Sequence, residues 1–184
     1  TPARSRMTLR FGTDGIRGVA NRDLTPELVT ALGRAAARVL GRDAPFVVGR
    51  DTRRSGPLVQ AALVAGLCAE GATVELAGVL PTPGVAHLAK VRDAAAVVIS
   101  ASHNPFEDNG IKLFARGGRK VTEELEEQVE RELRRLATSL PEGGPVGVDV
   151  GVDGALKDPL EEYVAHVVGA LEGRDLAGLT LAVA

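Results

Sequence analysis

The apolar run Ala94-Ala-Ala-Val-Val-Ile99 constrains the fold more than any other feature of this 184-residue chain. It is too short for an ordinary helix and contains no polar residue. Such a run is typical of a strand that is buried on both faces, inside a sheet covered by helices. Polar residues follow at once, from Ser100 to Asn109. Because active sites of open α/β sheets gather at the carboxyl ends of strands, this segment is the first place to expect a site.

Strand-like and helix-like segments alternate along the first 140 residues. Helix starts are indicated by Thr25-Pro26-Glu27, in which Thr25 is the expected N-cap, and by Ser55, which can cap a second helix. Further helices are expected from Thr82 and Thr122, and further strands at Phe46–Val48, Thr73–Leu80 and Ile111–Phe114. This alternation predicts an α/β layer fold with parallel strand pairs joined by right-handed crossovers.

The segment Pro141–Gly154 is rich in glycine and proline and indicates a domain boundary. We therefore predict one domain over residues 1–150. Residues 151–184 are expected to form a linker, a helix and a strand of a second, truncated α/β domain. The helix is expected to open at the capping box Asp158–Glu161, and the strand at Leu179–Ala184.

Composition excludes several classes of function. A formal net charge of −2 offers no basic surface for a nucleic-acid backbone. The single Cys68 excludes an internal disulfide and a cysteine-based metal site. No run approaches the roughly 18 apolar residues of a membrane helix, so we expect no membrane partner and a cytoplasmic location.

The segment Ile99–Phe114, ISASHNPFEDNGIKLF, contains the richest set of chemical groups. Ser102 beside His103 could act as a nucleophile, and Lys112 could hold phosphate oxygens by charge. Backbone N–H groups around Asn109 could add to an anion cradle. The alternative is a polar turn whose side chains bond the local backbone, but the buried strand and Lys112 favour a functional loop.

Three ordered motifs resemble the α-D-phosphohexomutase superfamily. They are FGTDGIRG at Phe11–Gly18, GRDTRRSG at Gly49–Gly56 and the phosphoserine-loop sequence SASHNPFEDNGIK within Ile99–Phe114. The first and third together most resemble the branch that acts on glucosamine phosphate. The resemblance implies a three-layer α/β domain with a mixed, mostly parallel sheet covered by helices. It also allows a homodimer, because the family uses its first domain for dimer contacts.

The resemblance implies a sugar-phosphate substrate and a reversible interconversion of glucosamine 6-phosphate and glucosamine 1-phosphate. The reaction runs through a bisphosphorylated sugar, which also serves as activator, and a phosphorylated enzyme on the route to UDP-N-acetylglucosamine. Ser102 would carry the phosphate, His103 would help to set the loop, and Lys112 would lie beside the phosphoserine and assist proton movement. Phosphoryl transfer needs positive charge and positioning more than covalent assistance.

Other residues receive roles from the same resemblance. Arg17 would belong to the first loop, facing the cleft, and with Asn104 and Asn109 would bind substrate or phosphate. Arg50 and Asp51 would hold the serine loop in place. The alternatives are that Arg17 pairs with a neighbouring carboxylate of its own loop and that Arg50 and Asp51 form a purely structural ion pair.

In this superfamily one Mg²⁺ ion is held by an oxygen of the serine phosphate and by three aspartates of a D-G-D-x-D-R segment. The chain supplies Ser102 but contains no such segment, so the fragment alone is expected to be inactive. The alternatives are a phosphoglucomutase or phosphomannomutase of the same superfamily, or a non-catalytic dimerisation domain. A serine hydrolase is disfavoured because Ser102 lacks a G-x-S-x-G elbow, and a dinucleotide site because the first loop lacks G-x-G-x-x-G.

Overall fold

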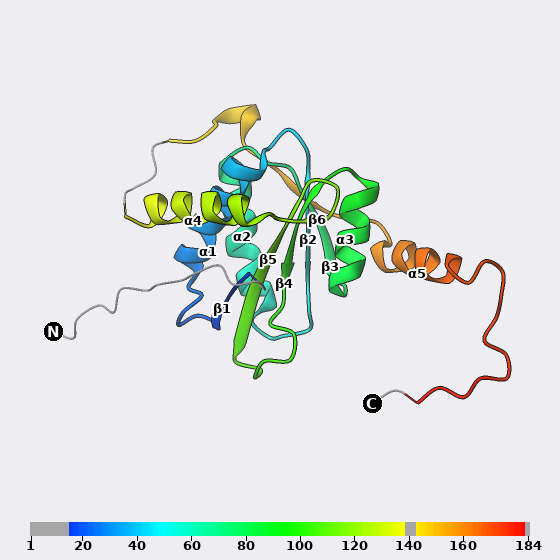
Figure 1. Cartoon of the computed structure of the whole chain (residues 1–184). Helices are drawn as coiled ribbons and strands as arrows, with labels where there is room; N and C mark the ends of the chain where they lie inside the picture. The colour runs from blue at the N-terminus through cyan, green and yellow to red at the C-terminus, as the bar shows by residue number, and fades with distance from the viewer. Residues whose placement is uncertain (1–14, 139–142, 183–184) are drawn as a thin grey trace.

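The computed structural model describes residues 15–138 and 143–182, which form a sheet with helices packed on both of its faces (Figure 1). The strands are β1 (Ile16–Val19), β2 (Phe46–Arg50), β3 (Val74–Val79), β4 (Ala95–Ile99), β5 (Asp108–Ala115), β6 (Arg119–Lys120) and β7 (Asp153–Ala155). The helices are α1 (Pro26–Leu40), α2 (Gly56–Ala69), α3 (Thr82–Val91), α4 (Glu123–Thr138) and α5 (Pro159–Gly169), with a short 3-10 turn at Gly147–Asp149.

The sheet has the order β1-β5-β4-β2-β3-β7, and β6 pairs with β5 at its far end. Strand β2 lies between β3 and β4 and is parallel to both, and β7 is parallel to β3. Strand β5 is antiparallel to β1, β4 and β6. Among the described strands, β5 alone therefore runs against the common direction, and the expected mixed, mostly parallel sheet is confirmed.

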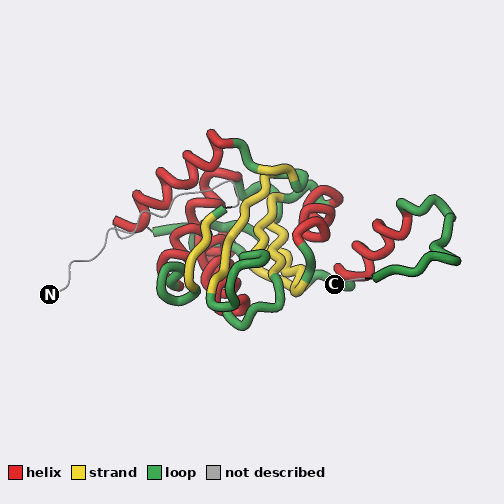
Figure 2. The backbone as a smooth tube through the Cα atoms, turned by 60° about the horizontal axis from the view of Figure 1, so that its bottom comes forward, coloured by secondary structure: helices red, strands yellow, loops and turns green. Residues whose placement is uncertain are grey.

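Helices cover both faces of the sheet, which gives three layers (Figure 2). Helices α1, α2 and α4 lie on one side, where the larger core includes Leu32, Leu63, Val97 and Leu133. Helix α3 covers the other face with a smaller core around Leu88. Every residue of β4 is buried, as its apolar sequence predicts, because a central strand contacts helices on both sides.

The two predicted helix caps have different outcomes. Thr25 caps α1 as expected, since its Oγ1 accepts the backbone N–H of Leu28 at 3.4 Å. Ser55 precedes α2, but its side chain does not cap the helix. Its hydroxyl instead accepts a hydrogen bond from the Asn109 side chain at 2.9 Å. The prediction of a Ser55 cap is wrong because a partner on a distant segment takes the hydroxyl.

Helices α1 and α2 pack so closely that side chains are excluded at their contact. A Cβ atom added to Gly66 of α2 would lie 2.1 Å from the backbone oxygen of Thr30 in α1. A Cβ on Gly33 of α1 would lie 2.4 Å from the oxygen of Leu63 in α2. The glycines therefore set the distance between the two helices of the major core.

Parallel strands bring their carboxyl ends to one edge of the sheet, at the lower end in Figure 1. Arg50, the last residue of β2, lies beside Ile99 of β4 and Val79 of β3. Strand β5 begins at this edge, where Asp108 pairs with Val19 at the end of β1. The loops 51–55 and 100–107 are consequently neighbours, which confirms the predicted position of the serine loop.

The C-terminal part differs in detail from the prediction. Residues 153–155 form β7, which adds to the edge of the same sheet as the preceding strands. The predicted helix is present as α5, but Asp158 has a left-handed backbone (φ 48°) and does not cap it. Residues 179–182 of the expected Leu179–Ala184 strand are not in a strand, because no described segment lies alongside as a partner. A domain boundary near residue 150 stays a prediction.

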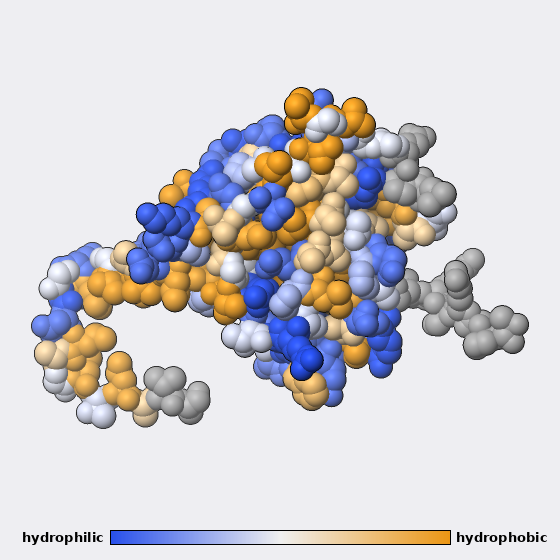
Figure 3. Space-filling view, turned by 180° about the vertical axis from the view of Figure 1, so that it is seen from behind, coloured by the Kyte–Doolittle hydropathy of each residue, from blue (hydrophilic) through white to orange (hydrophobic). Residues whose placement is uncertain are grey.

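Helix α5 contacts α3 but leaves a row of apolar side chains on the surface, visible in Figure 3. Each is about half exposed; the row consists of Leu160, Val164, Val167 and Val168. In the part of the chain that the structure describes, no helix has the length and apolarity needed to span a membrane.

Candidate active site at the carboxyl edge of the sheet

The serine loop between β4 and β5 consists of two consecutive turns. The backbone N–H of Asn104 bonds the carbonyl of Ala101 at 3.1 Å, and the N–H of Asp108 bonds the carbonyl of Pro105 at 3.1 Å. Ser102 lies in the first turn with its side chain exposed and its backbone in the left-handed region, at φ 56°. A non-glycine residue held in this region is strained, and such strain clusters at functional sites.

Ser102 has two polar neighbours within the loop. Its backbone N–H donates to the hydroxyl of Ser100 at 3.1 Å, which helps to hold the left-handed conformation. Its Oγ lies 3.4 Å from Nδ1 of His103, so the two side chains that were predicted to act together are in contact. The contact is long, and both side chains are exposed to the space beyond the sheet edge.

Arg53 holds this loop and was not among the predicted site residues. Its Nη2 donates to the carbonyls of Ser102 and Asn104, each at 2.9 Å. Its Nη1 donates to the carbonyl of Asp108 at 3.0 Å and also to that of Pro105. One guanidinium therefore gathers four backbone carbonyls from both turns of the loop.

Asp51 orients Arg53. Its Oδ1 accepts the backbone N–H of Arg53 at 3.0 Å, and its Oδ2 accepts Nε–H of Arg53 at 3.1 Å. With the four bonds to the loop, all five N–H donors of the guanidinium are engaged. The prediction that Asp51 supports the serine loop therefore has a geometric basis, but its partner is Arg53.

Arg50 and Asp51, which were both predicted to hold the serine loop, do not form the alternative ion pair with each other. Nη1 of Arg50 donates to the backbone oxygen of Asp51 at 3.3 Å, whereas the carboxylate of Asp51 pairs with Arg53. Arg50 is in register with Ile99, whose side chain belongs to the core beneath α1 and α2. The Cδ atom of Arg50 lies close to Gly56 at the start of α2. Arg50 thus extends toward the α2 side, and its hydrogen bond goes to the backbone of Asp51.

Arg17 lies in strand β1, not in a loop as the sequence suggested. Its Nη1 donates to Oδ1 of Asn104 at 3.0 Å, and the amide of Asn104 donates to Oδ2 of Asp108 at 2.9 Å. Gly110 lies opposite Arg17 in β5, and a Cβ there would come within 3.1 Å of the Arg17 Cγ. The glycine leaves room for the Arg17 side chain to cross β5 and reach the loop. The remaining part of the first motif, Phe11–Asp14, lies outside the described residues.

Asn109 has a different position from the one predicted. It is fully buried, its Nδ2 donates to the Ser55 hydroxyl at 2.9 Å, and its Oδ1 accepts the backbone N–H of Gly110 at 2.8 Å. A buried amide with these partners cannot bind phosphate in this conformation. Asn109 instead ties the start of β5 to the loop that carries Arg53.

Lys112 lies in β5, two residues beyond Gly110. Alternate residues of a strand share a face, and directly paired residues do too, so Lys112 and Arg17 lie on the same face of the sheet. Phe114, two residues further along, packs against the minor core beneath α3, which identifies that face. The structure therefore brings two predicted cationic residues to one face of the sheet.

The described residues do not complete a metal site. They contain no group of three or more histidine, cysteine, aspartate or glutamate side chains placed to hold an ion. Ser102 would provide one oxygen ligand through a phosphate, and the carboxylates Asp51 and Asp108 nearby are engaged by Arg53 and Asn104. The described residues by themselves do not fit a complete Mg²⁺ centre.

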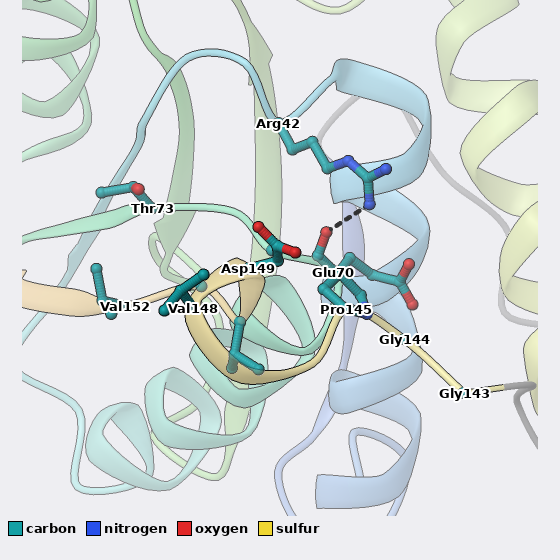
Figure 4. Close-up of a pocket in the computed structure, with 12 residues that line it drawn as sticks. Arg42, Glu70, Thr73, Gly143, Gly144, Pro145, Val148, Asp149 and Val152 are labelled. Carbon is teal, nitrogen blue, oxygen red and sulfur yellow. Dashed lines mark hydrogen bonds between the residues drawn. The ribbon is translucent and has the colours of Figure 1, made fainter.

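A hollow of about 850 Å³ lies elsewhere, at the opposite edge of the sheet (Figure 4). It is lined by Arg42, by residues near the end of α2 and the start of β3, and by residues 143–145 and 148–152, and all of these precede strands. Arg42 extends over the hollow and donates to the backbone oxygen of Glu70 at 2.8 Å. The hollow lacks the strand-terminal serine and its supporting arginine, so we place the candidate site at the carboxyl edge.

Residues 8–139 match the family described as phosphoglucomutase/phosphomannomutase, alpha/beta/alpha domain I. The chain is 57% identical over 124 residues to a phosphoglucosamine mutase of Pelotomaculum thermopropionicum, covering 65% of the chain and 28% of the relative. It is 49% identical over 179 residues to a phosphoglucosamine mutase of Streptomyces coelicolor, covering 93% of the chain and 39% of the relative.

A crystal structure of a phosphoglucomutase/phosphomannomutase family protein from Burkholderia thailandensis has a similar fold. The TM-score is 0.72 at 28% sequence identity, and the match covers 90% of this chain and 36% of that one. The chain thus spans well under half the length of the proteins to which it is similar, and its fold corresponds to one part of them.

Proposed function

The chain belongs to the phosphoglucomutase/phosphomannomutase family, and from that membership we propose that Ser102 carries the phosphoryl group of a hexose-phosphate mutase. The relatives named phosphoglucosamine mutase support glucosamine phosphate as the substrate. The proposed reaction interconverts glucosamine 6-phosphate and glucosamine 1-phosphate in the cytoplasm and supplies amino-sugar biosynthesis. It is assigned to the full-length protein, because the chain spans only 28% and 39% of these two relatives.

The proposed chemistry is a pair of phosphoryl transfers. In the first, the bond between phosphorus and Ser102 Oγ breaks as a sugar hydroxyl oxygen bonds to phosphorus. The hydroxyl loses its proton, and Ser102 regains one. The bisphosphorylated sugar then presents its other phosphate, which returns to Ser102 by the reverse steps. Both steps pass through a transition state with charge spread over the phosphoryl oxygens, so positioned positive groups stabilise it.

The side chains have distinct proposed roles. Ser102 is the nucleophile and phosphate carrier, and His103 bonds its hydroxyl in the unphosphorylated state. Lys112 supplies positive charge on the face that it shares with Arg17 and assists proton movement. Arg17 is the candidate contact to substrate phosphate, and its bond to Asn104 fixes its reach.

We propose that this chain contributes one Mg²⁺ ligand, a phosphate oxygen on Ser102. Bound Mg²⁺ would supply neutralisation of charge on the transferring group. The remaining ligands are assigned to parts of the protein beyond the described residues, because these contain no suitable cluster.

The observation that carries the proposal is the conformation of Ser102. Its side chain is exposed at the carboxyl edge of a parallel strand pair, on a left-handed residue inside a loop held by four bonds from one arginine. A merely structural turn has no need of such strain at a serine, because glycine or asparagine would adopt the same backbone at lower cost.

The test is turnover of glucosamine 6-phosphate by the full-length protein with Mg²⁺ and a catalytic amount of sugar bisphosphate. Ser102→Ala is expected to abolish turnover, because no other group at this position accepts the phosphate. Thr138→Ala is the matched control, since it removes a hydroxyl that bonds only the carbonyls of its own helix. Wild-type turnover in Ser102→Ala would remove the proposal.

Glucose or mannose phosphate is the second candidate substrate, because the family that matches is described as phosphoglucomutase/phosphomannomutase. The ratio of kcat/KM values for the three 6-phosphates decides between them. A glucosamine preference is expected. A homodimer remains part of the proposal, and sedimentation of the full-length protein tests it without affecting the assignment of Ser102.

A further inference from the structure

Arg53 gathers carbonyl groups that would otherwise point in several directions. Its two terminal nitrogens bond the oxygens of Ser102, Asn104, Pro105 and Asp108. The Arg53 side chain is only 11% exposed, while its bonds to the carbonyls of Ser102 and Pro105 lie at the surface. Hydrogen bonds from a charged donor are stronger than those between neutral groups. The loop around Ser102 therefore has an inner side occupied by oxygen atoms and one cation.

The orientation of the carbonyls determines the orientation of the amides. In a trans peptide the C=O and the next N–H point in opposite directions, and none of the described peptides is cis. Because the carbonyls of Ser102 and Pro105 point to Arg53, the N–H groups of His103 and Phe106 point away from it. Among the described residues, neither of these N–H groups has a backbone acceptor.

Backbone N–H groups that have no acceptor within the protein can donate to a bound anion. The N–H of Ser102 itself is taken by the Ser100 hydroxyl. The N–H of His103 belongs to the residue directly after the nucleophile, so it lies closest in sequence to a phosphoryl group on Ser102. Its direction depends on the carbonyl that Arg53 holds at 2.9 Å.

We infer that Arg53 is a positioning residue: by binding the loop carbonyls it turns the backbone N–H of His103, together with that of Phe106, toward the phosphoryl group carried by Ser102. Asp51 orients Arg53 for this role, because its carboxylate accepts a hydrogen bond from Nε of the guanidinium. Arg53 acts through the backbone and does not itself touch the sugar. The inference rests on the proposed function, since it concerns the phosphate on Ser102.

Phosphorus-31 NMR on the loaded full-length protein tests the inference. A free phosphoserine has a second pKa near 6, and N–H donors aimed at the dianion lower it. We expect the Ser102 phosphate of the wild type to titrate below about 6, and that of Arg53→Ala to return to about 6. Arg54→Ala is the control, because Arg54 is the exposed neighbour with the same charge, and it is expected to titrate like the wild type.

Kinetics on the same variants provide a second readout. Arg53→Ala is expected to lower kcat about 100-fold, with little change in KM, because the transferring group is misplaced while sugar binding is kept. Added guanidinium ion should restore part of kcat. The Arg53→Lys variant should keep the low kcat of Arg53→Ala, since a single ammonium group cannot replace the planar guanidinium, which binds carbonyls through both terminal nitrogens. If Arg53→Ala fails to fold, the same measurements of kcat and of the phosphate titration are made on Arg53→Lys and Asp51→Asn, and the same results are expected.

The outcomes separate the two claims. A wild type that carries no phosphate on Ser102 overturns the proposed function and this inference together. Phosphate on Ser102 with the same titration and kcat in Arg53→Ala as in the wild type overturns the role of Arg53 alone. Failure of Arg53→Ala to accept phosphate, with normal loading of Arg54→Ala, supports it.

Discussion

Arg53 and Arg38 each form several hydrogen bonds, but they stabilise different parts of the molecule. At the carboxyl edge of the sheet, Arg53 binds backbone carbonyls of one loop that has almost no apolar packing of its own. Among the helices, Arg38 bonds the carboxylates of Glu70 at 2.7 Å and Glu132 at 2.8 Å and so links α1 to the end of α2 and to α4. The bonds of Arg53 fix the shape of an exposed segment. Those of Arg38 add to elements that an apolar core already holds.

The comparison indicates that stability depends mainly on the helix side and function mainly on the serine loop. The helix side buries Leu32, Leu63, Val129 and Leu133, so changes there should alter the free energy of unfolding. The loop side holds Phe106 81% exposed and Ser102 in a strained conformation, so changes there should alter activity with little loss of stability.

The largest effect on stability is expected from Gly66→Ala. The new methyl would lie 2.1 Å from a backbone oxygen, so α1 and α2 must move apart and the core beneath them must loosen. We expect a loss of about 3 kcal/mol in the free energy of unfolding, measured by chemical denaturation. Gly169→Ala is the control, because no atom lies near its added Cβ. Equal stability of both variants would contradict the close packing of α1 on α2.

Arg38→Ala is expected to cost about 2 kcal/mol, because it leaves the Glu70 carboxylate, only 6% exposed, with fewer cationic partners. Denaturation of this chain measures the loss. Phosphate loading of Ser102 in the full-length variant should be normal. Arg53→Ala is the counterpart and should show the opposite result, with loading or kcat impaired and stability nearly kept. A defect in phosphate loading of a folded Arg38→Ala variant would contradict the separation of stability and function between the two regions.

Glu132 should make the helix side sensitive to acid. Hydrogen bonds from Arg135 and then Arg38 lower its pKa to about 2, from an ordinary value near 4.5. Because the folded pKa is depressed, the stabilisation is fully present above about pH 4.5 and is lost as the pH falls toward 2. With allowance for its partial exposure, Glu132→Gln should cost about 1 kcal/mol at pH 7 and almost nothing at pH 2. Denaturation at several pH values checks this, and a loss that is the same at pH 7 and pH 2 would exclude the ionic origin.

The smallest effect is a gain in stability. Ser102→Gly should raise the free energy of unfolding by about 0.5 to 1 kcal/mol, because glycine adopts the left-handed region without strain, while phosphate loading is lost. Ser100→Gly is the control, since Ser100 has no positive φ and should only be destabilised. A loss of stability in Ser102→Gly would show that the serine conformation is not strained.

The sequence predicted those parts of the fold that local patterns determine. The apolar run of β4, the helix start at Thr25-Pro26 and the order of strands and helices follow from burial on two faces and from capping chemistry. Strand β7 was missed because Asp153-Gly154-Ala155 has no strand pattern of its own, and it forms only beside β3. Arg17 was placed in a loop because glycines surround it, although pairing with β5 makes the segment a strand.

The site was predicted in part for similar reasons. The Ser102 loop was identified from its residues and its position after a buried strand. Arg53 was missed because the sequence offers two adjacent arginines, and only the folded chain determines which one turns toward the loop and which stays exposed. Asn109 was predicted to bind phosphate from the backbone N–H groups near it and from the family resemblance, whereas the fold buries its side chain against Ser55. The signal that could have found Arg53 is its loop, since neighbouring parallel strands bring GRDTRRSG next to the serine.

Mapping of the phosphorylated residue tests whether Ser102 carries the phosphoryl group. The full-length protein is incubated with a hexose bisphosphate, and intact mass and peptide fragmentation locate the phosphate in the wild type, Ser102→Ala and Ser100→Ala. We predict one phosphate on Ser102 in the wild type and in Ser100→Ala, and none in Ser102→Ala. A phosphate on another residue of the wild type, or its persistence in Ser102→Ala, would contradict the account.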